Sequence, residues 1–131
     1  MKKILLITHK TFGIGLIEGI PEEKKNLTKR IDFVGFDEDE GNEDLLAKIA
    51  NCTQGDYSCC LVDLQGGTPA NVSQVAFWES SRVPIISGVN TEMLIAAAEC
   101  LEEDKKDVCT KNIENAGKSG IQCICLNEKG C

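Results

Sequence analysis

Several features that define common protein classes are missing from this chain of 131 residues. No apolar run approaches the roughly 18 residues that a membrane-spanning helix needs. Positive charge is scarce, because 14 Lys and Arg stand against 21 Asp and Glu, which gives a formal net charge of −7. Such a balance repels nucleic-acid phosphates and anionic lipid surfaces. The sequence therefore argues against a membrane-embedded or nucleic-acid-binding protein.

Histidine is almost absent, and the cysteines lack metal-site spacing. His9 is the only histidine, and no C-x-x-C pair occurs among the eight cysteines. One histidine cannot complete the usual mixed zinc sets, and the adjacent Cys59 and Cys60 would point to opposite faces of a strand. A cysteine-based metal or redox site is therefore the least favoured alternative.

A secretion signal is also missing. The apolar run that follows Lys3 stops at Thr8, which is too short for the hydrophobic region of a signal peptide. We therefore expect a cytoplasmic protein whose cysteines are thiols and behave mostly as small buried hydrophobes.

What is present fits one soluble α/β domain over residues 1–131, with 42% hydrophobic and 27% charged residues. Continuous apolar runs without polar alternation are typical of parallel strands covered on both faces, and helical segments separate them here. The predicted strands are Lys3–Thr8, Ile31–Phe36, Ser58–Leu64 and Val83–Gly88.

The best-marked helix start is Thr68-Pro69, a threonine cap followed by proline, with Val72, Val75 and Ala76 as its buried stripe. The segment after His9 should form only a short or frayed helix, because it holds three glycines. Further segments of expected structure are helices Asn42–Gln54, Thr91–Glu103 and Val108–Lys118, and a final edge or exchanged strand Ile121–Leu126.

Polar residues gather where the first and third predicted strands end. If these strands are neighbours, His9 faces Asp63. The Gly66-Gly67 turn and the helix beginning at Thr68 could receive phosphate oxygens through backbone N–H groups. A neutral imidazole held at one nitrogen by Asp63 could attack phosphorus through the other. The same parts could also bind a nucleotide or serve a small hydrolase.

A resemblance to a known family narrows this choice and covers nearly the whole chain. The chain resembles the IIA component of the mannose-type sugar phosphotransferase system. The matching strings are Thr8-His9 after an apolar strand, VDLQGGTPAN at residues 62–71, SGVNTEML at 87–94 and AGKSGI at 116–121.

That resemblance implies an open four-stranded parallel sheet of order 2-1-3-4 with helices on both faces, and a homodimer that commonly exchanges the C-terminal strand. His9 would accept phosphate from the phosphocarrier HPr and pass it to a separate IIB chain, which acts with membrane components IIC and IID in sugar uptake. Asp63 would pair with His9, and Gly66, Gly67 and Thr68 would lie beside the phosphate. No metal or cofactor is implied, and the sugar is not specified.

One departure from the family pattern is Lys10, which stands where the family usually has glycine. Its side chain could attract the phosphoryl group, obstruct a partner or point into solvent. Two other functions stay open: a regulatory module switched by phosphorylation of His9, and the phosphoryl-donor subunit of a dihydroxyacetone kinase. The Gly67–Asn71 string fits the mannose type better than the kinase subunit.

Overall fold

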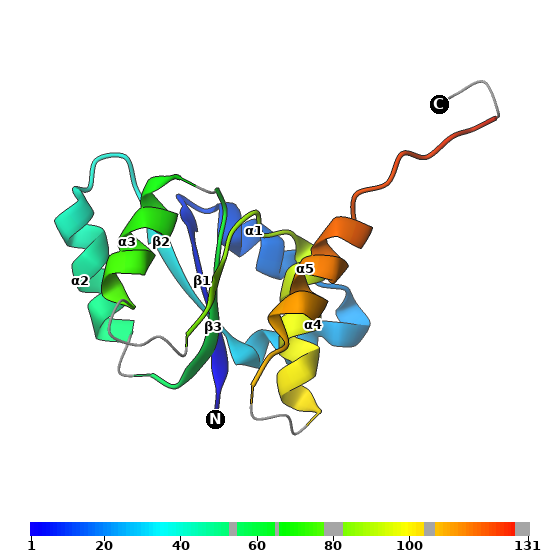
Figure 1. Cartoon of the computed structure of the whole chain (residues 1–131), viewed down its shortest axis with the longest axis horizontal. Helices are drawn as coiled ribbons and strands as arrows, with labels where there is room; N and C mark the ends of the chain where they lie inside the picture. The colour runs from blue at the N-terminus through cyan, green and yellow to red at the C-terminus, as the bar shows by residue number, and fades with distance from the viewer. Residues whose placement is uncertain (53–54, 65, 78–82, 104–106, 128–131) are drawn as a thin grey trace.

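A computed structural model describes residues 1–52, 55–64, 66–77, 83–103 and 107–127. Its centre is a parallel four-stranded sheet of order β2-β1-β3-β4, which confirms the order that the resemblance implied (Figure 1). The strands are β1 (Lys3–His9), β2 (Ile31–Phe36), β3 (Tyr57–Val62) and the short β4 (Ile85–Ile86).

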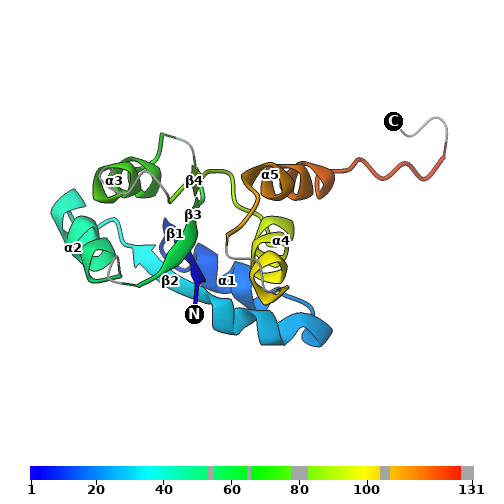
Figure 2. The same ribbon diagram turned by 60° about the horizontal axis from the view of Figure 1, so that its bottom comes forward.

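Helices cover both faces of the sheet, as predicted. Helices α2 and α3 lie on one face, whereas α1, η1, α4 and α5 lie on the other (Figures 1 and 2). The 3-10 helix η1 was not predicted. The helices are α1 (Phe12–Glu18), η1 (Glu22–Arg30), α2 (Asn42–Cys52), α3 (Thr68–Ala76), α4 (Thr91–Glu102) and α5 (Thr110–Ser119).

Strand β1 supplies both hydrophobic cores because successive side chains of a strand point to opposite faces. Ile4 and Leu6 pack on the side of α4, whereas Leu5 and Ile7 pack on the side of α2. All four are fully buried, and each contributes roughly 1.5–3 kcal/mol by leaving water. The central strand that carries His9 at its end is therefore rigidly held.

The cysteines follow the prediction only in part. Cys59 and Cys60 are buried on opposite faces of β3, and burial raises the pKa of the Cys60 thiol to about 12. Cys109, the N-cap of α5, and Cys123, in the C-terminal tail, are exposed, however. Cys125 is disulfide-bonded, which the expectation of thiols throughout did not include.

Helix α3 corrects two details of the prediction. Gly67 is its N-cap and Thr68 is its first residue, so the threonine side chain does not cap the helix. Val75 is 65% exposed, although it was expected in the buried stripe. The buried side of the helix is formed instead by Pro69, Ala70, Val72 and Ser73.

Helix α1 is short, as its glycines predicted, and ends at Gly19. A Cβ atom on Gly13 would lie 2.4 Å from Phe33 Cε1, so glycine is needed for α1 to pack against β2. The Gly13 N–H donates to Thr8 Oγ1 at 2.8 Å. The chain after His9 thus turns back tightly onto the sheet.

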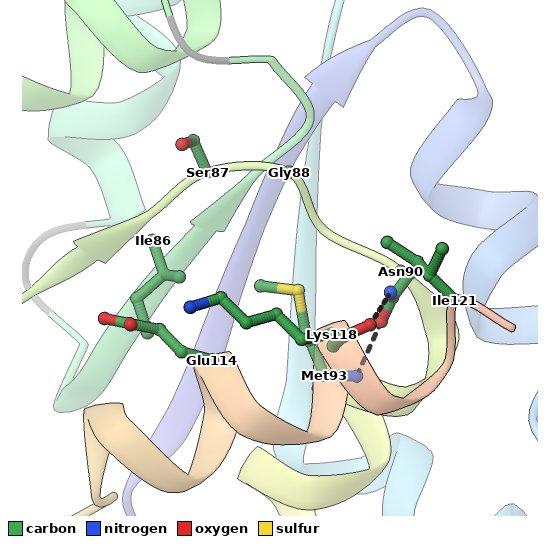
Figure 3. A pocket seen from close by; sticks show the side chains of 9 residues that line it. Ile86, Ser87, Gly88, Asn90, Met93, Glu114, Lys118 and Ile121 are labelled. Carbon is green, nitrogen blue, oxygen red and sulfur yellow. Dashed lines mark hydrogen bonds between the residues drawn. The ribbon is translucent and has the colours of Figure 1, made fainter.

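The tail Ile121–Leu126 forms no strand, so the prediction is wrong for an isolated chain. It runs away from the body (Figure 1), and in the described part of the chain nothing pairs with the free edge of β4. Ile124 and Leu126 are 83% and 92% exposed. Ile121 lines a pocket of about 160 Å³ between β4 and α5, together with Ile86 and Met93 (Figure 3).

None of the helices in the described ranges has both the length and the apolar character needed to cross a bilayer.

Candidate functional site

His9 is the last residue of β1, and its side chain is 35% exposed at the carboxyl end of the sheet. The ring packs edge-on against Phe36 of β2, with ring centroids 5.8 Å apart. The backbone N–H of the next residue, Lys10, donates to Phe36 O at 2.7 Å. The imidazole is therefore fixed from the β2 side but remains open to a reactant.

Asp63 fixes the ring from the β3 side. Its side chain is 7% exposed, and Oδ2 lies 2.7 Å from His9 Nδ1 and accepts the His9 backbone N–H at 2.8 Å. Oδ1 accepts the N–H of Leu64 at 2.9 Å. Because a carboxylate only accepts, Nδ1 carries the proton and Nε2 of the neutral ring keeps its lone pair. Strands β1 and β3 are neighbours, so the predicted juxtaposition is present.

The end of β3 is held on its other side by the segment that follows β4. Gly88 N donates to Asp63 O at 3.1 Å, and Val89 N donates to Val62 O at 3.0 Å. Gly88 has φ +78°, a conformation that suits glycine. This clamp fixes the backbone of Asp63 and, through it, the carboxylate that orients the imidazole.

The glycine turn lies against the same ring. A Cβ atom on Gly67 would be 3.4 Å from His9 Cε1, the ring carbon between the two nitrogens. Gly66 has φ +77°, and its carbonyl accepts from Asn71 Nδ2 at 3.3 Å. His9, Asp63 and Gly67 are thus brought together directly, and Gly66 and Thr68 flank Gly67 in the chain.

The start of α3 completes the surroundings of the ring. Gly67 caps this helix and, as a glycine, has no side chain to accept from the first-turn N–H groups. These groups carry the partial positive charge of a helix N-terminus, which attracts an anion. Next to Nε2 the site can therefore offer a nucleophile and an anion-binding turn together.

Lys10 adopts a backbone conformation that favours glycine, with φ +45°. Its Nζ lies 3.4 Å from Glu38 Oε1, and its side chain is 59% exposed. The Lys10 side chain therefore points into solvent, where it forms an ion pair with the segment that follows β2.

Two residues of the site were missed from the sequence. Phe36 ends an apolar strand, so nothing distinguished its contact with His9 from ordinary core packing. Asn71 stands in the string that carried the resemblance, but no role was assigned to its amide, which supports Gly66. In the described ranges no group of three or more potential metal ligands occurs.

The sequence matches the family EIIA-man, described as the fructose IIA component of the phosphotransferase system, over residues 3–114. No curated protein matches the chain. Among solved structures, the phosphotransferase system component EIIA from Streptococcus agalactiae is similar, with a TM-score of 0.77 and 24% identity over 94% of this chain and 97% of that one.

A mannose/sorbose-specific IIA subunit from Enterococcus faecalis has a TM-score of 0.74 and 24% identity, with 98% of each chain covered. A IIA protein associated with the fucose utilization operon of Streptococcus pneumoniae has a TM-score of 0.73 and 22% identity over 93% of this chain and 92% of that one. At these identities the structural likeness concerns the fold.

Proposed function

The chain belongs to the family of the fructose IIA component of the phosphotransferase system, and from that premise we propose that it carries a phosphoryl group on His9. The observation that carries this proposal is the position of the ring. Asp63 binds Nδ1, Gly67 lies against the Cε1 edge, and the side chain is partly exposed. Nε2 is therefore the nitrogen that we expect to be phosphorylated.

In the proposed reaction the lone pair of Nε2 attacks the phosphorus of phospho-HPr. A bond forms between Nε2 and phosphorus, while the bond between phosphorus and the donor's histidine nitrogen breaks and returns its electron pair to that nitrogen. Asp63 keeps the proton on Nδ1 and stabilises the positive charge that develops on the ring. The N–H groups of Gly66 and Thr68 stabilise the transferring oxygens, and Gly67, whose own N–H donates to Leu64 O at 3.3 Å, lies beside them. Attack by a IIB nucleophile then removes the group.

The proposed setting follows the family. Residues 1–131 act as one cytoplasmic IIA domain that meets membrane components IIC and IID only through a separate IIB chain. A homodimer is also proposed, in which the tail Ile121–Leu126 pairs with a second copy. The exposure of Ile124 and Leu126 supports that exchange, because apolar side chains favour burial.

The direct test is incubation with labelled phosphoenolpyruvate, enzyme I and HPr. We expect a label that acid removes and alkali does not, and that is absent from His9→Ala. Circular dichroism of that variant verifies its fold. Equal labelling of the folded variant and the unmodified chain would contradict the assignment to His9.

A further inference from the structure

The residue before His9 on β1 carries a hydroxyl group that is completely buried. Thr8 is 0% exposed, and the four residues that precede it on the strand are buried hydrophobic side chains. A buried hydroxyl costs free energy unless it forms hydrogen bonds, so its partners indicate why the residue is there. Thr8 stands in a string that carried the resemblance, but the sequence assigned no role to its side chain.

The hydroxyl joins the end of β1 to the start of α1. Thr8 Oγ1 donates to His9 O at 3.2 Å and accepts the N–H of Gly13 at 2.8 Å. Gly13 lies in the first turn of α1, and Thr11, the N-cap of that helix, forms no side-chain cap hydrogen bond. The strand therefore supplies an acceptor that the helix start lacks. One side chain thus closes the turn that follows His9.

The same hydroxyl fixes the peptide group that joins His9 to Lys10. The carbonyl of this peptide accepts from Thr8 Oγ1, and its N–H donates to Phe36 O at 2.7 Å. The peptide leads into the left-handed backbone of Lys10, at φ +45°, which a residue with a Cβ atom avoids. Loss of the Thr8 hydroxyl would release one side of the peptide, and rotation of the peptide would relieve Lys10. The hydroxyl therefore opposes a movement that the local backbone favours.

We propose that Thr8 is a positioning residue for His9. Two hydrogen bonds hold the backbone on either side of the His9 Cα atom: the N–H donates to Asp63 Oδ2 at 2.8 Å, and the carbonyl accepts from Thr8. Together they set the direction of the imidazole, so that Nδ1 meets Asp63 Oδ2 at 2.7 Å and Nε2 stays open to a reactant. Thr8 reaches the reaction only through this backbone. Its effect on phosphoryl transfer rests on the proposed function, whereas its effect on the ring does not.

Ser58 offers a matched control at the opposite end of the sheet from His9. It is 1% exposed near the start of β3, and its Oγ donates to Asp107 Oδ1 at 3.0 Å and accepts the N–H of Val108 at 2.9 Å. Like Thr8, it is a buried hydroxyl that binds a segment leading into a helix. Ser58→Ala therefore removes a comparable pair of hydrogen bonds without touching the backbone of His9.

The test compares Thr8→Val, which removes the hydroxyl and keeps the shape of the side chain, with Thr8→Ser, which keeps the hydroxyl. The first measurement is nitrogen NMR of the imidazole at mildly alkaline pH, which distinguishes a protonated ring nitrogen from one that keeps its lone pair. His9 is the only histidine, so the signals belong to one ring. We expect the proton on Nδ1 in the unmodified chain and in Thr8→Ser, and a mixture of the two tautomers in Thr8→Val.

The second measurement is the single-turnover rate of transfer from phospho-HPr. Thr8→Val should slow transfer by roughly ten- to hundred-fold, because a small displacement of the nucleophile is costly, and Thr8→Ser should restore most of the rate. Ser58→Ala should lower the urea midpoint, as Thr8→Val does, but leave the ring signals and the transfer rate unchanged. If Thr8→Val does not fold, Thr8→Ala replaces it, because a water molecule can then fill the space and bind the Gly13 N–H.

Three results would overturn the role of Thr8. Unchanged ring signals and an unchanged rate in folded Thr8→Val would show that the hydroxyl only caps α1. An equal loss of rate in Ser58→Ala would assign the effect to overall stability, and no recovery in Thr8→Ser would assign it to side-chain packing. If the unmodified chain accepts no phosphate, the proposed function itself fails, whereas the ring signals, which need no donor, still decide whether Thr8 positions His9.

Discussion

The two ends of the sheet each hold one aspartate in a hydrogen-bonded network. At the amino end, Asp32 accepts from the Tyr57 hydroxyl at 2.7 Å and from Lys3 Nζ at 3.0 Å. At the carboxyl end, Asp63 accepts from two backbone N–H groups and from the ring of His9. The Tyr57 hydroxyl and the Lys3 ammonium group each bind Asp32 through the one polar atom of their side chain. The imidazole of His9 binds Asp63 through Nδ1 and keeps a second nitrogen, Nε2, for reaction. Similar carboxylate chemistry therefore stabilises one end and prepares the other for reaction.

The surroundings of the two networks strengthen the contrast. Near the amino end, Arg30 and Lys29 pair with Glu102 of α4, and these ion pairs connect η1 to that helix. At the carboxyl end, a glycine turn and a helix start whose N-cap is a glycine leave room for an incoming anion. Changes at the carboxyl end should therefore alter phosphoryl transfer, and changes at the amino end should alter stability.

The largest expected effect is that of Asp63→Asn. The amide no longer selects the tautomer with the proton on Nδ1, so we expect transfer from phospho-HPr to fall by roughly two to four orders of magnitude. Single-turnover rates measure the loss, and circular dichroism verifies that the fold is retained. Unchanged rates in a folded variant would show that the pair is merely structural.

Gly67→Ala, also at the carboxyl end of the sheet, should slow phosphoryl transfer less than Asp63→Asn does. The backbone at Gly67 has φ −78°, which alanine adopts without strain, and its methyl group would lie 3.4 Å from His9 Cε1. We expect transfer to slow by about ten-fold because the methyl displaces phosphate oxygens from the ring. The folding midpoint in urea should stay within error, and a large loss of stability would point to a packing role instead.

Asp32→Asn tests the amino end. Burial alone would raise the pKa of Asp32, but the hydrogen bonds of Tyr57 and Lys3 outweigh it and hold the pKa below its usual value. A lowered pKa stabilises the fold above the pKa of an ordinary aspartate, and this contribution is lost as the pH falls through the folded value. We expect a loss of about 1 kcal/mol at neutral pH, measured by urea unfolding, with unchanged transfer rates.

The same variant supplies its own control in acid. Its stability difference from the unmodified chain should shrink as Asp32 becomes protonated. A constant difference from neutral pH to below the ordinary aspartate range would contradict the role of the charged form.

The smallest effect is expected for Lys10→Gly. Glycine relieves the left-handed backbone at φ +45°, while the greater freedom of the unfolded chain offsets part of the gain. We expect a net stabilisation of up to about 1 kcal/mol in urea unfolding. Lys10→Ala, which removes the ammonium group but keeps the strain, should not stabilise. If both variants stabilise equally, the charge rather than the backbone is responsible.

The sequence predicted the strands well because the runs in β1, β2 and β3 are mostly apolar and lack strict polar alternation. It could not by itself predict that β1 lies beside β3, since strand order depends on contacts far apart in the chain. The resemblance supplied that order and hence the pairing of His9 with Asp63. The site therefore followed from motif and topology together.

The wrong predictions share a physical cause. Val75 has helical spacing with Val72, but whether a side chain is buried depends on what packs against its helix. The tail Ile121–Leu126 has strand-like composition, but a strand exists only where a partner edge is supplied. In each case the missing information lies in a neighbour rather than in the local sequence.

The bond between Asp63 and the ring also has a kinetic consequence under the proposed function. Because Asp63 holds Nδ1, the phosphoryl donor and the acceptor must both approach the ring at Nε2. The two partners therefore cannot be bound there at the same time. Turnover would follow a ping-pong scheme, with parallel lines in double-reciprocal plots and excess acceptor competing against the donor. The ratio of the two partners in the cell would then set how long the protein remains charged with phosphate.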